Sequence, residues 1–190
     1  MSFLPDGHKD PNPPSNYMQF NDGDNTFRVL SSAIVGWEIW GEEEKDGKKV
    51  RVPYRFHKDD DILPKYQDLE TDTNRFKFFW AFVVYNREDK KVQILEITQN
   101  TVRKAITALI NNKKWGDPKE YDIVVTRNRT GPKPMDIEYL VTPDPKEPID
   151  SEIVNKYQSM NINLEALYEG KDPFKSEEVN AEDIPDFPER

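Results

Sequence analysis

Residues 76–97 read FKFFWAFVVYNREDKKVQILEI, two apolar runs joined by a polar turn. In the first run, apolar side chains occupy both alternating faces, whereas a half-buried strand alternates apolar with polar residues. We therefore expect one face to pack on the core and the other to present aromatic rings to a different contact. Apolar residues then recur at helical spacing from 102 to 110. The pattern predicts a hairpin followed at once by a helix that closes over one side of a small sheet.

Further strand patterns lie on both sides of this unit, at 26–40, 48–56, 121–129 and 136–141. A helix between the third and fourth strands of a five-stranded Greek-key barrel is the order of an OB-fold. The extra hairpin around Gly47 would then elaborate the first loop of the barrel. We predict an all-β fold with one helix, a five-stranded Greek-key OB-fold barrel. An SH3-like barrel or an α+β sheet with one helix is the alternative.

Composition divides the chain into four segments. Residues 1–16 form a proline-punctuated leader that we expect to be flexible, and 17–148 form the barrel domain. Residues 149–169 are a short helical extension, and 170–190 an acidic tail expected to be disordered. The net charge is −9, but from residue 142 onward 13 acidic residues face 5 basic ones, a net of −8. The body is therefore nearly neutral at −1, and its charge does not exclude an anionic partner.

Several functional classes receive no support from the sequence. The chain has no cysteine, and its two histidines lack the spacing of metal ligands. No apolar run approaches about 18 residues and no signal-peptide pattern is present, so we expect a cytoplasmic protein without membrane contact. Glycine-rich phosphate loops and nucleophile motifs are also missing. We expect no enzyme activity, no catalytic residues, no metal site and no cofactor.

Aromatic and basic residues are interleaved in the middle of the chain. Residues 48–56 read KKVRVPYRF, four bases beside two rings on a hairpin expected to be exposed. A groove that stacks bases on rings and tracks phosphates with Lys and Arg binds single strands without reading their sequence. Alternatively, the rings are core and the bases a solvated face, although a small barrel cannot bury every ring. The predicted nucleic-acid-binding residues are Arg28, Trp37, Trp40, Lys48, Lys49, Arg51, Tyr54, Arg55, Phe56, Lys77, Trp80, Lys91, Arg127 and Arg129.

Five strings in order carry a resemblance to a known family: YMQF at 17–20, FRVL at 27–30, FWAFVVYN at 79–86, ILEITQ at 94–99 and KWGDP at 114–118. They resemble the single-stranded DNA-binding proteins of tailed bacteriophages, over about residues 17–148. The resemblance implies a protein with an OB-fold. Such a protein would coat and protect single-stranded DNA in phage replication, recombination or repair, in the host cytoplasm. The resemblance also implies an acidic tail that recruits replication or recombination proteins. The resemblance is compatible with a homodimer as well as with a monomer.

The end of the chain fits this resemblance in part. The tail residues implied to bind partners are Asp183, Ile184, Asp186 and Phe187. The tail departs from the Phe-ended tails of bacterial homologues because three more residues follow Phe187. The chain also departs from zinc-containing phage relatives, since it has no cysteine ligands. A solubilising end without a partner is the alternative interpretation of such a segment.

Two other functions are kept as alternatives. The first is a protein-interaction barrel, a phage structural or host-inhibitory factor without nucleic-acid binding, which the near-neutral body favours. The second is a metal-dependent nuclease at Asp59, Asp60 and Asp61. Adjacent carboxylates point in different directions, and no base stands at matching spacing, so a solvated loop is the simpler interpretation.

Overall fold

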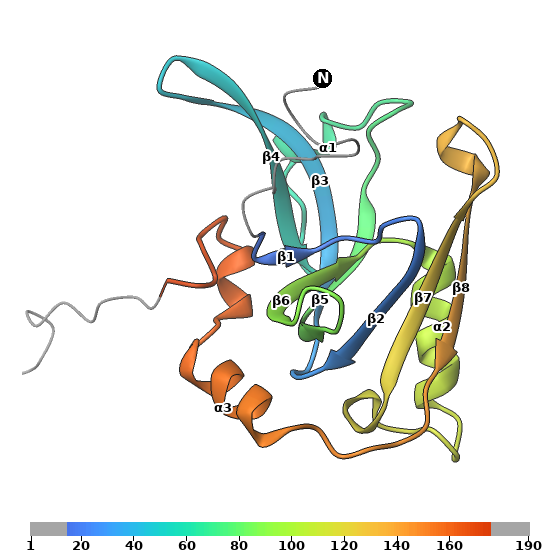
Figure 1. Cartoon of the computed structure of the whole chain (residues 1–190). Coiled ribbons are helices and arrows are strands. Elements are labelled where there is room, and N and C mark those ends of the chain that lie inside the picture. Colours follow the sequence, from blue (N-terminus) through green and yellow to red (C-terminus); the bar gives the residue numbers. More distant parts are fainter. Residues whose placement is uncertain (1–14, 176–190) are drawn as a thin grey trace, which may run out of the picture. The chain divides into compact units, whose positions relative to one another are not determined.

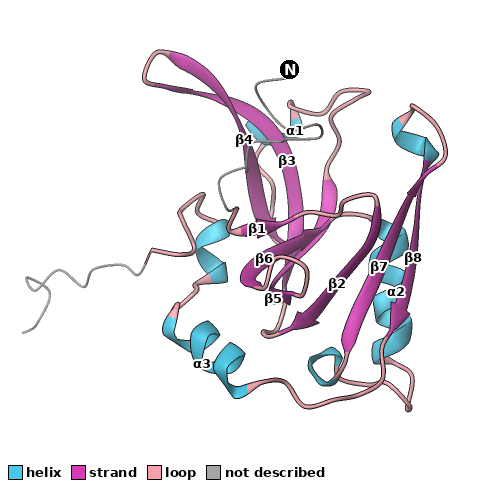
Figure 2. Ribbon diagram, in the orientation of Figure 1, coloured by secondary structure: helices cyan, strands magenta, loops and turns pink. Residues whose placement is uncertain are grey.

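The computed structural model describes residues 15–175 of the chain. Most of the predicted leader and the four predicted partner-binding tail residues lie outside these described residues. The described part is mostly β, with eight strands in a mixed sheet and three α-helices (Figure 2). Asn100–Ile110 is the helix predicted within the barrel domain, Ser151–Ser159 falls in the predicted helical extension, and Pro64–Gln67 was not predicted. Across residues 15–175, every helix is too short or too polar to cross a membrane. The chain forms two compact units, the first from residues 15–35 and 79–153, the second from 36–78 and 154–175.

The first unit contains most of the sheet (Figure 1). Its strands follow the order β1-β6-β5-β2-β7-β8, and neighbours are antiparallel except for the parallel pair β1 and β6. Helix α2 (Asn100–Ile110) follows β6 in the chain and packs along β8. The strand bounds are β1 Tyr17–Met18, β2 Gly23–Val29, β5 Lys77–Asn86, β6 Lys91–Ile97, β7 Asp122–Arg129 and β8 Ile137–Pro143.

The core of the first unit lies between this sheet and α2. Val102 and Ile106 are buried and Leu109 packs against the core, whereas Ile110 is exposed, so the predicted apolar stripe is confirmed except at its end. Val102 and Ile106 belong to one buried cluster with side chains of five strands, including Phe27 and Phe82, whose ring centroids lie 6.4 Å apart. Fully burying one such side chain stabilises the fold by roughly 1.5–3 kcal/mol. The apolar side of α2 therefore covers the inner face of the sheet in this unit.

Strand β5 is buried on both faces, which differs from our expectation of an exposed aromatic face. Phe82 and Val84 belong to the core of the first unit. On the opposite face Phe79 and Ala81 have no exposed surface and Val83 has 1%. A continuous apolar run is typical of a strand covered on both sides, and the rings of this strand's second half are therefore structural.

The second unit is built on the hairpin of β3 (Ile34–Lys45) and β4 (Lys48–His57) (Figure 1). The strands pair from Gly36 opposite His57 to Lys45 opposite Lys48. Asp46 and Gly47 form the turn with φ of 52° and 73°, the left-handed geometry that a two-residue hairpin turn requires. The predicted hairpin is confirmed. The other α-helices are α1 (Pro64–Gln67) and α3 (Ser151–Ser159), and 3-10 turns lie at Pro118–Glu120, Pro134–Asp136 and Leu164–Leu167.

The predicted long strand at 26–40 is interrupted. β2 ends at Val29 and β3 begins at Ile34, so the chain bends at residues 30–33 rather than at Gly36. Ser31 stabilises the bend because its hydroxyl accepts the backbone N–H of Val83 at 2.9 Å and donates to the carbonyl of Ser32 at 2.8 Å. The path of paired strands is open at β1 and β8, so closure into a barrel is not confirmed.

Candidate nucleic-acid interface

The hairpin carries its aromatic side chains on one face. In its register Trp37 lies opposite Phe56, and Ile39 lies opposite Tyr54. Directly opposed residues of an antiparallel pair project on the same side, so both rings of β4 share a face with Trp37. Two rings from the connector between β4 and β5 and one from the start of β5 join them. We call this set the aromatic face: Trp37, Tyr54, Phe56, Tyr66, Phe76 and Phe78.

The rings of the aromatic face touch one another but none is buried. Tyr66, on α1, has its ring centroid 4.9 Å from that of Tyr54 and 5.0 Å from that of Phe56. Trp37 meets Phe78 edge-on at 5.1 Å, and 36% of its surface is exposed. The other five rings are half-buried. A contiguous set of partly exposed rings is what base stacking needs, because each ring keeps free surface while its neighbours hold it in place.

The connector contributes a cation and is anchored to the hairpin. Lys65 Nζ lies 4.6 Å from the ring centroid of Tyr66, within cation–π range. The side-chain amide of Asn74 donates to the carbonyl oxygens of Trp40 and Leu69, at 2.8 and 2.9 Å. Within this mostly polar connector, the apolar side chains of Tyr66 and Leu69 are the sequence signal that could have predicted its packing on the hairpin.

Trp40 lies on the opposite face of the hairpin, with the bases of β4. Arg51 Cζ is 5.4 Å from the Trp40 ring centroid. Arg55 Nε lies 3.6 Å from a Glu38 carboxylate oxygen, and both side chains are nearly buried. Arg55 therefore forms a structural ion pair with Glu38. Two of the predicted rings, Trp37 and Trp40, have opposite parity along β3, so they lie on opposite faces of the hairpin, and Trp80 belongs to the first unit.

Acidic side chains oppose the basic ones at the hairpin tip. Lys49 Nζ lies 3.8 Å from Glu42, and Lys45 Nζ lies 3.8 Å from Glu43, all four side chains being largely exposed. Exposed pairs of this length contribute about 0–1 kcal/mol and are easily exchanged for other anions. The same acids act on Tyr54, whose pKa is raised first by burial and then by its hydrogen bond and charge interaction with Glu43.

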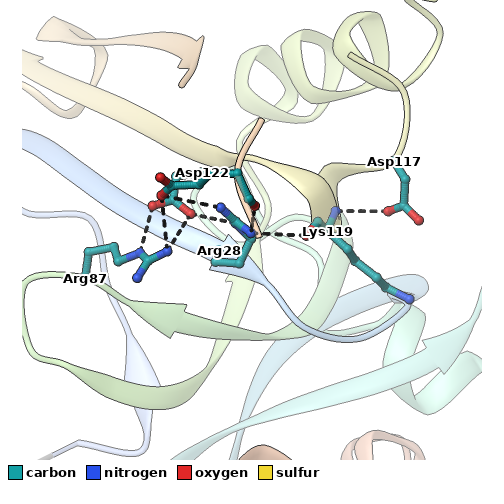
Figure 3. Close-up of polar contacts among 6 residues, drawn as sticks. Arg28, Arg87, Asp117, Lys119 and Asp122 are labelled. Atoms are coloured by element: carbon teal, nitrogen blue, oxygen red, sulfur yellow. Dashed lines mark hydrogen bonds and ion pairs between the residues drawn. The ribbon is translucent and has the colours of Figure 1, made fainter. Parts of the chain in front are cut away.

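Arg28 is wrongly predicted as a phosphate contact. Its side chain has no exposed surface. The Arg28 Nε donates to Asp122 Oδ1 at 2.6 Å and its Nη1 to the carbonyl of Glu147 at 3.0 Å (Figure 3). Arg87 shares the same carboxylate through Nε, at 2.7 Å from Oδ2, and this contact raises the pKa of Arg87. The cluster joins β2, β7 and the segment after β8, and Arg28 itself has no surface that a phosphate could reach.

The remaining predicted residues are placed separately. Lys48 and Lys77 are exposed in the second unit. In the first unit, Arg129 is exposed near the end of β7, and Arg127 is paired with Asp22. The half-buried Lys91 borders a polar cavity of about 360 Å³, and Trp80 lines an apolar one.

The acidic loop gives no sign of a metal centre. Asp60 Oδ2 accepts the backbone N–H of His57 at 2.9 Å, a contact that closes the loop after β4. Within residues 15–175, no three His, Cys, Asp or Glu side chains are grouped so that they could hold a metal ion. The carboxylates of Asp59 and Asp61 are exposed there, as a solvated loop requires.

Comparisons with protein-family models, with curated proteins and with solved structures find no match to this chain. The aromatic face belongs to one unit, whereas the predicted basic residues are divided between the two units and pair in part with acids.

Proposed function

We propose that this protein binds single-stranded DNA without strong sequence preference, and that the aromatic face is its main contact surface. Unstacked bases present flat faces, and each base stacked on a protein ring contributes roughly 1–3 kcal/mol. Six partly exposed rings in one unit offer that contact, with Lys65 beside them. This arrangement is the observation that carries the proposal.

The strand order supports an OB-fold for the first unit. Numbered along the chain as barrel strands, β2, β5, β6, β7 and β8 give the spatial order 3-2-1-4-5, with α2 between the third and fourth. This is the OB-fold order, whose first loop and second and third strands commonly bind oligonucleotides. The β3–β4 hairpin stands in that first loop of the chain, between β2 and β5. A ligand-binding role for the hairpin follows from this assignment.

The biological setting follows from the sequence resemblance. We infer a non-enzymatic protein that coats and protects single strands in phage replication, recombination or repair, in the host cytoplasm. The acidic segment after residue 175, with apolar Ile184 and Phe187, would recruit partner proteins. Its six acidic residues against one basic residue give it the charge to compete with DNA for the body.

A protein-docking role for the same rings is the competing function. The acid–base pairs at the hairpin tip favour it, because they weaken the positive potential that phosphates would meet. The two functions differ in whether bases are needed. A protein-docking surface has no reason to distinguish oligonucleotides from other polyanions.

Fluorescence titration of the full chain separates these functions. Oligo-dT should quench tryptophan emission at low salt, because Trp37 is exposed and would stack on thymine. An oligomer of the same length made of abasic deoxyribose phosphate is the matched control, since it keeps the charge and lacks the rings. Quenching by oligo-dT alone supports the proposal. Equal responses to both, or none to either, would remove base stacking as the mode of binding.

A further inference from the structure

A cavity in the first unit is separate from the surface assigned above. It has a volume of about 310 Å³ and opens between the bend after β2, the first half of β5 and the end of α2. Trp80 forms one wall, and Ile106 and Ile110 of α2 contribute apolar side chains. Trp80 is half-buried and packs on the core, so its ring is held in a fixed position.

Polar groups of both kinds stand at the rim. Asp117 Oδ1 accepts the backbone N–H of Lys119 at 2.9 Å, which leaves its second carboxylate oxygen to accept from a ligand. The Lys119 ammonium group and the Ser32 hydroxyl group supply donors, and both side chains are exposed. The neighbouring Ser31 hydroxyl is already used by Val83 and by the Ser32 carbonyl. The rim therefore offers two donors and one acceptor around an apolar slot.

We propose that this cavity receives one unstacked nucleobase of the bound strand, with the base against Trp80 and its phosphate toward Lys119. The inference rests on the proposed function and extends it to a second site in the first unit. A heterocycle matches the slot because its faces are apolar while its edge carries donors and acceptors. Sites for small ligands measure about 300–1,000 Å³, so this volume at the lower end suits a single nucleotide.

Two variants alter the cavity without touching the hairpin. Ala33→Leu adds a larger apolar side chain at an exposed position that lines the cavity, and it should fill the slot. Ala108→Leu, at an exposed position of α2 outside the lining, is its matched control. Lys119→Ala removes the rim cation but keeps the backbone carbonyl that Arg28 uses, and Lys104→Ala on α2 is its control.

Photocrosslinking tests the site on the full chain. The probe is oligo-dT with one thymine replaced by 5-iododeoxyuridine, and the crosslinked peptides are identified by mass spectrometry. We expect crosslinks at Trp80 as well as at the aromatic face. Ala33→Leu should abolish the Trp80 crosslink and Lys119→Ala should reduce it, while both controls keep it. If the probe binds but Trp80 is not crosslinked, or Ala33→Leu leaves the yield unchanged, the cavity site is overturned and DNA binding stands.

A second measurement keeps the two proposals distinguishable if no oligonucleotide binds. Saturation-transfer NMR with free dTMP reports contact with the base protons and needs no hairpin. A signal that Ala33→Leu removes, and Ala108→Leu does not, supports a nucleobase site even without strand binding. No signal, or one that Ala33→Leu leaves intact, overturns it.

Discussion

Arg28 and Asp122 form a buried ion pair with the guanidinium Nε 2.6 Å from the carboxylate Oδ1. Their Cα positions are partners in the pairing of β2 with β7, and Arg87 takes the second carboxylate oxygen. The carbonyl of Asp122 also accepts the N–H of Asp144 at 2.9 Å. One residue therefore joins two strands, the β5–β6 turn and the segment after β8.

Replacing Asp122 with Asn should destabilise the protein strongly. The amide cannot neutralise two guanidinium groups, and removing one partner of a buried pair costs about 3–5 kcal/mol. Urea denaturation would measure the loss in the free energy of unfolding. Asp144→Asn is the control, because Asp144 is exposed and its hydrogen bond to Asp122 comes from its backbone N–H. Equal stability of the two variants would contradict a structural role for the pair.

Replacing Trp37 with Ala should weaken binding to oligo-dT by about 1–3 kcal/mol, the contribution of one stacked base. Trp40→Ala should weaken binding to oligo-dT less than Trp37→Ala does, because the Trp40 ring lies on the other face of the hairpin beside Arg51. Fluorescence anisotropy with labelled oligo-dT gives both affinities. A loss confined to Trp40→Ala would place DNA on the opposite face.

The stability of the protein at alkaline pH should depend on Tyr121. Burial raises the pKa of its hydroxyl group above the ordinary value, and nearby Asp117 and Glu120 add to the shift. The folded state thus favours the neutral hydroxyl group. The contribution of Tyr121 to the free energy of unfolding is complete below the ordinary pKa, and it is lost as the pH rises through the raised pKa. Unfolding free energies should fall more steeply above pH about 10 in the wild type than in Tyr121→Phe. Parallel curves would contradict this.

Truncation after Lys175 should strengthen binding to oligo-dT. It removes a net charge of −5, six acidic residues against one basic, that would otherwise compete with DNA. This end point is chosen because Pro173 is buried and its carbonyl accepts the N–H of Asn163 at 2.9 Å. Affinities of the two forms at low and high salt check the prediction. Identical affinities would remove self-competition by the tail.

Local patterns predicted the elements well because each depends on neighbours in the chain. The alternation in β3 and β4 and the Asp46-Gly47 turn were sufficient for the hairpin. Its register also contained information that sequence analysis left unused. The pairing of Glu42 with Arg51 and of Glu44 with Lys49 places acids opposite bases, and the opposite parity of Trp37 and Trp40 places them on different faces.

Long-range contacts could not be predicted in this way. Arg28 and Asp122 lie 94 residues apart, so an arginine within an apolar strand gave no sign of its partner. Coverage of β5 on both faces likewise depends on tertiary packing. Its continuous apolar pattern was compatible with burial, but 12% aromatic content suggested surplus rings on this strand instead. Partly exposed rings lie on the hairpin, on its connector and at Phe78 and Trp80 in the first half of β5.

We propose that single-stranded DNA binds to the second unit, where its bases stack on aromatic rings and its phosphates pair with basic side chains. Titration of oligo-dT across a series of salt concentrations tests it most directly, with the wild type beside Lys48→Ala/Lys49→Ala. The wild type should bind at low salt, with log affinity falling by about 0.7 per phosphate neutralised for each log unit of salt, and the variant should show a shallower slope. Absence of binding at low salt, even after truncation at Lys175, would contradict the account.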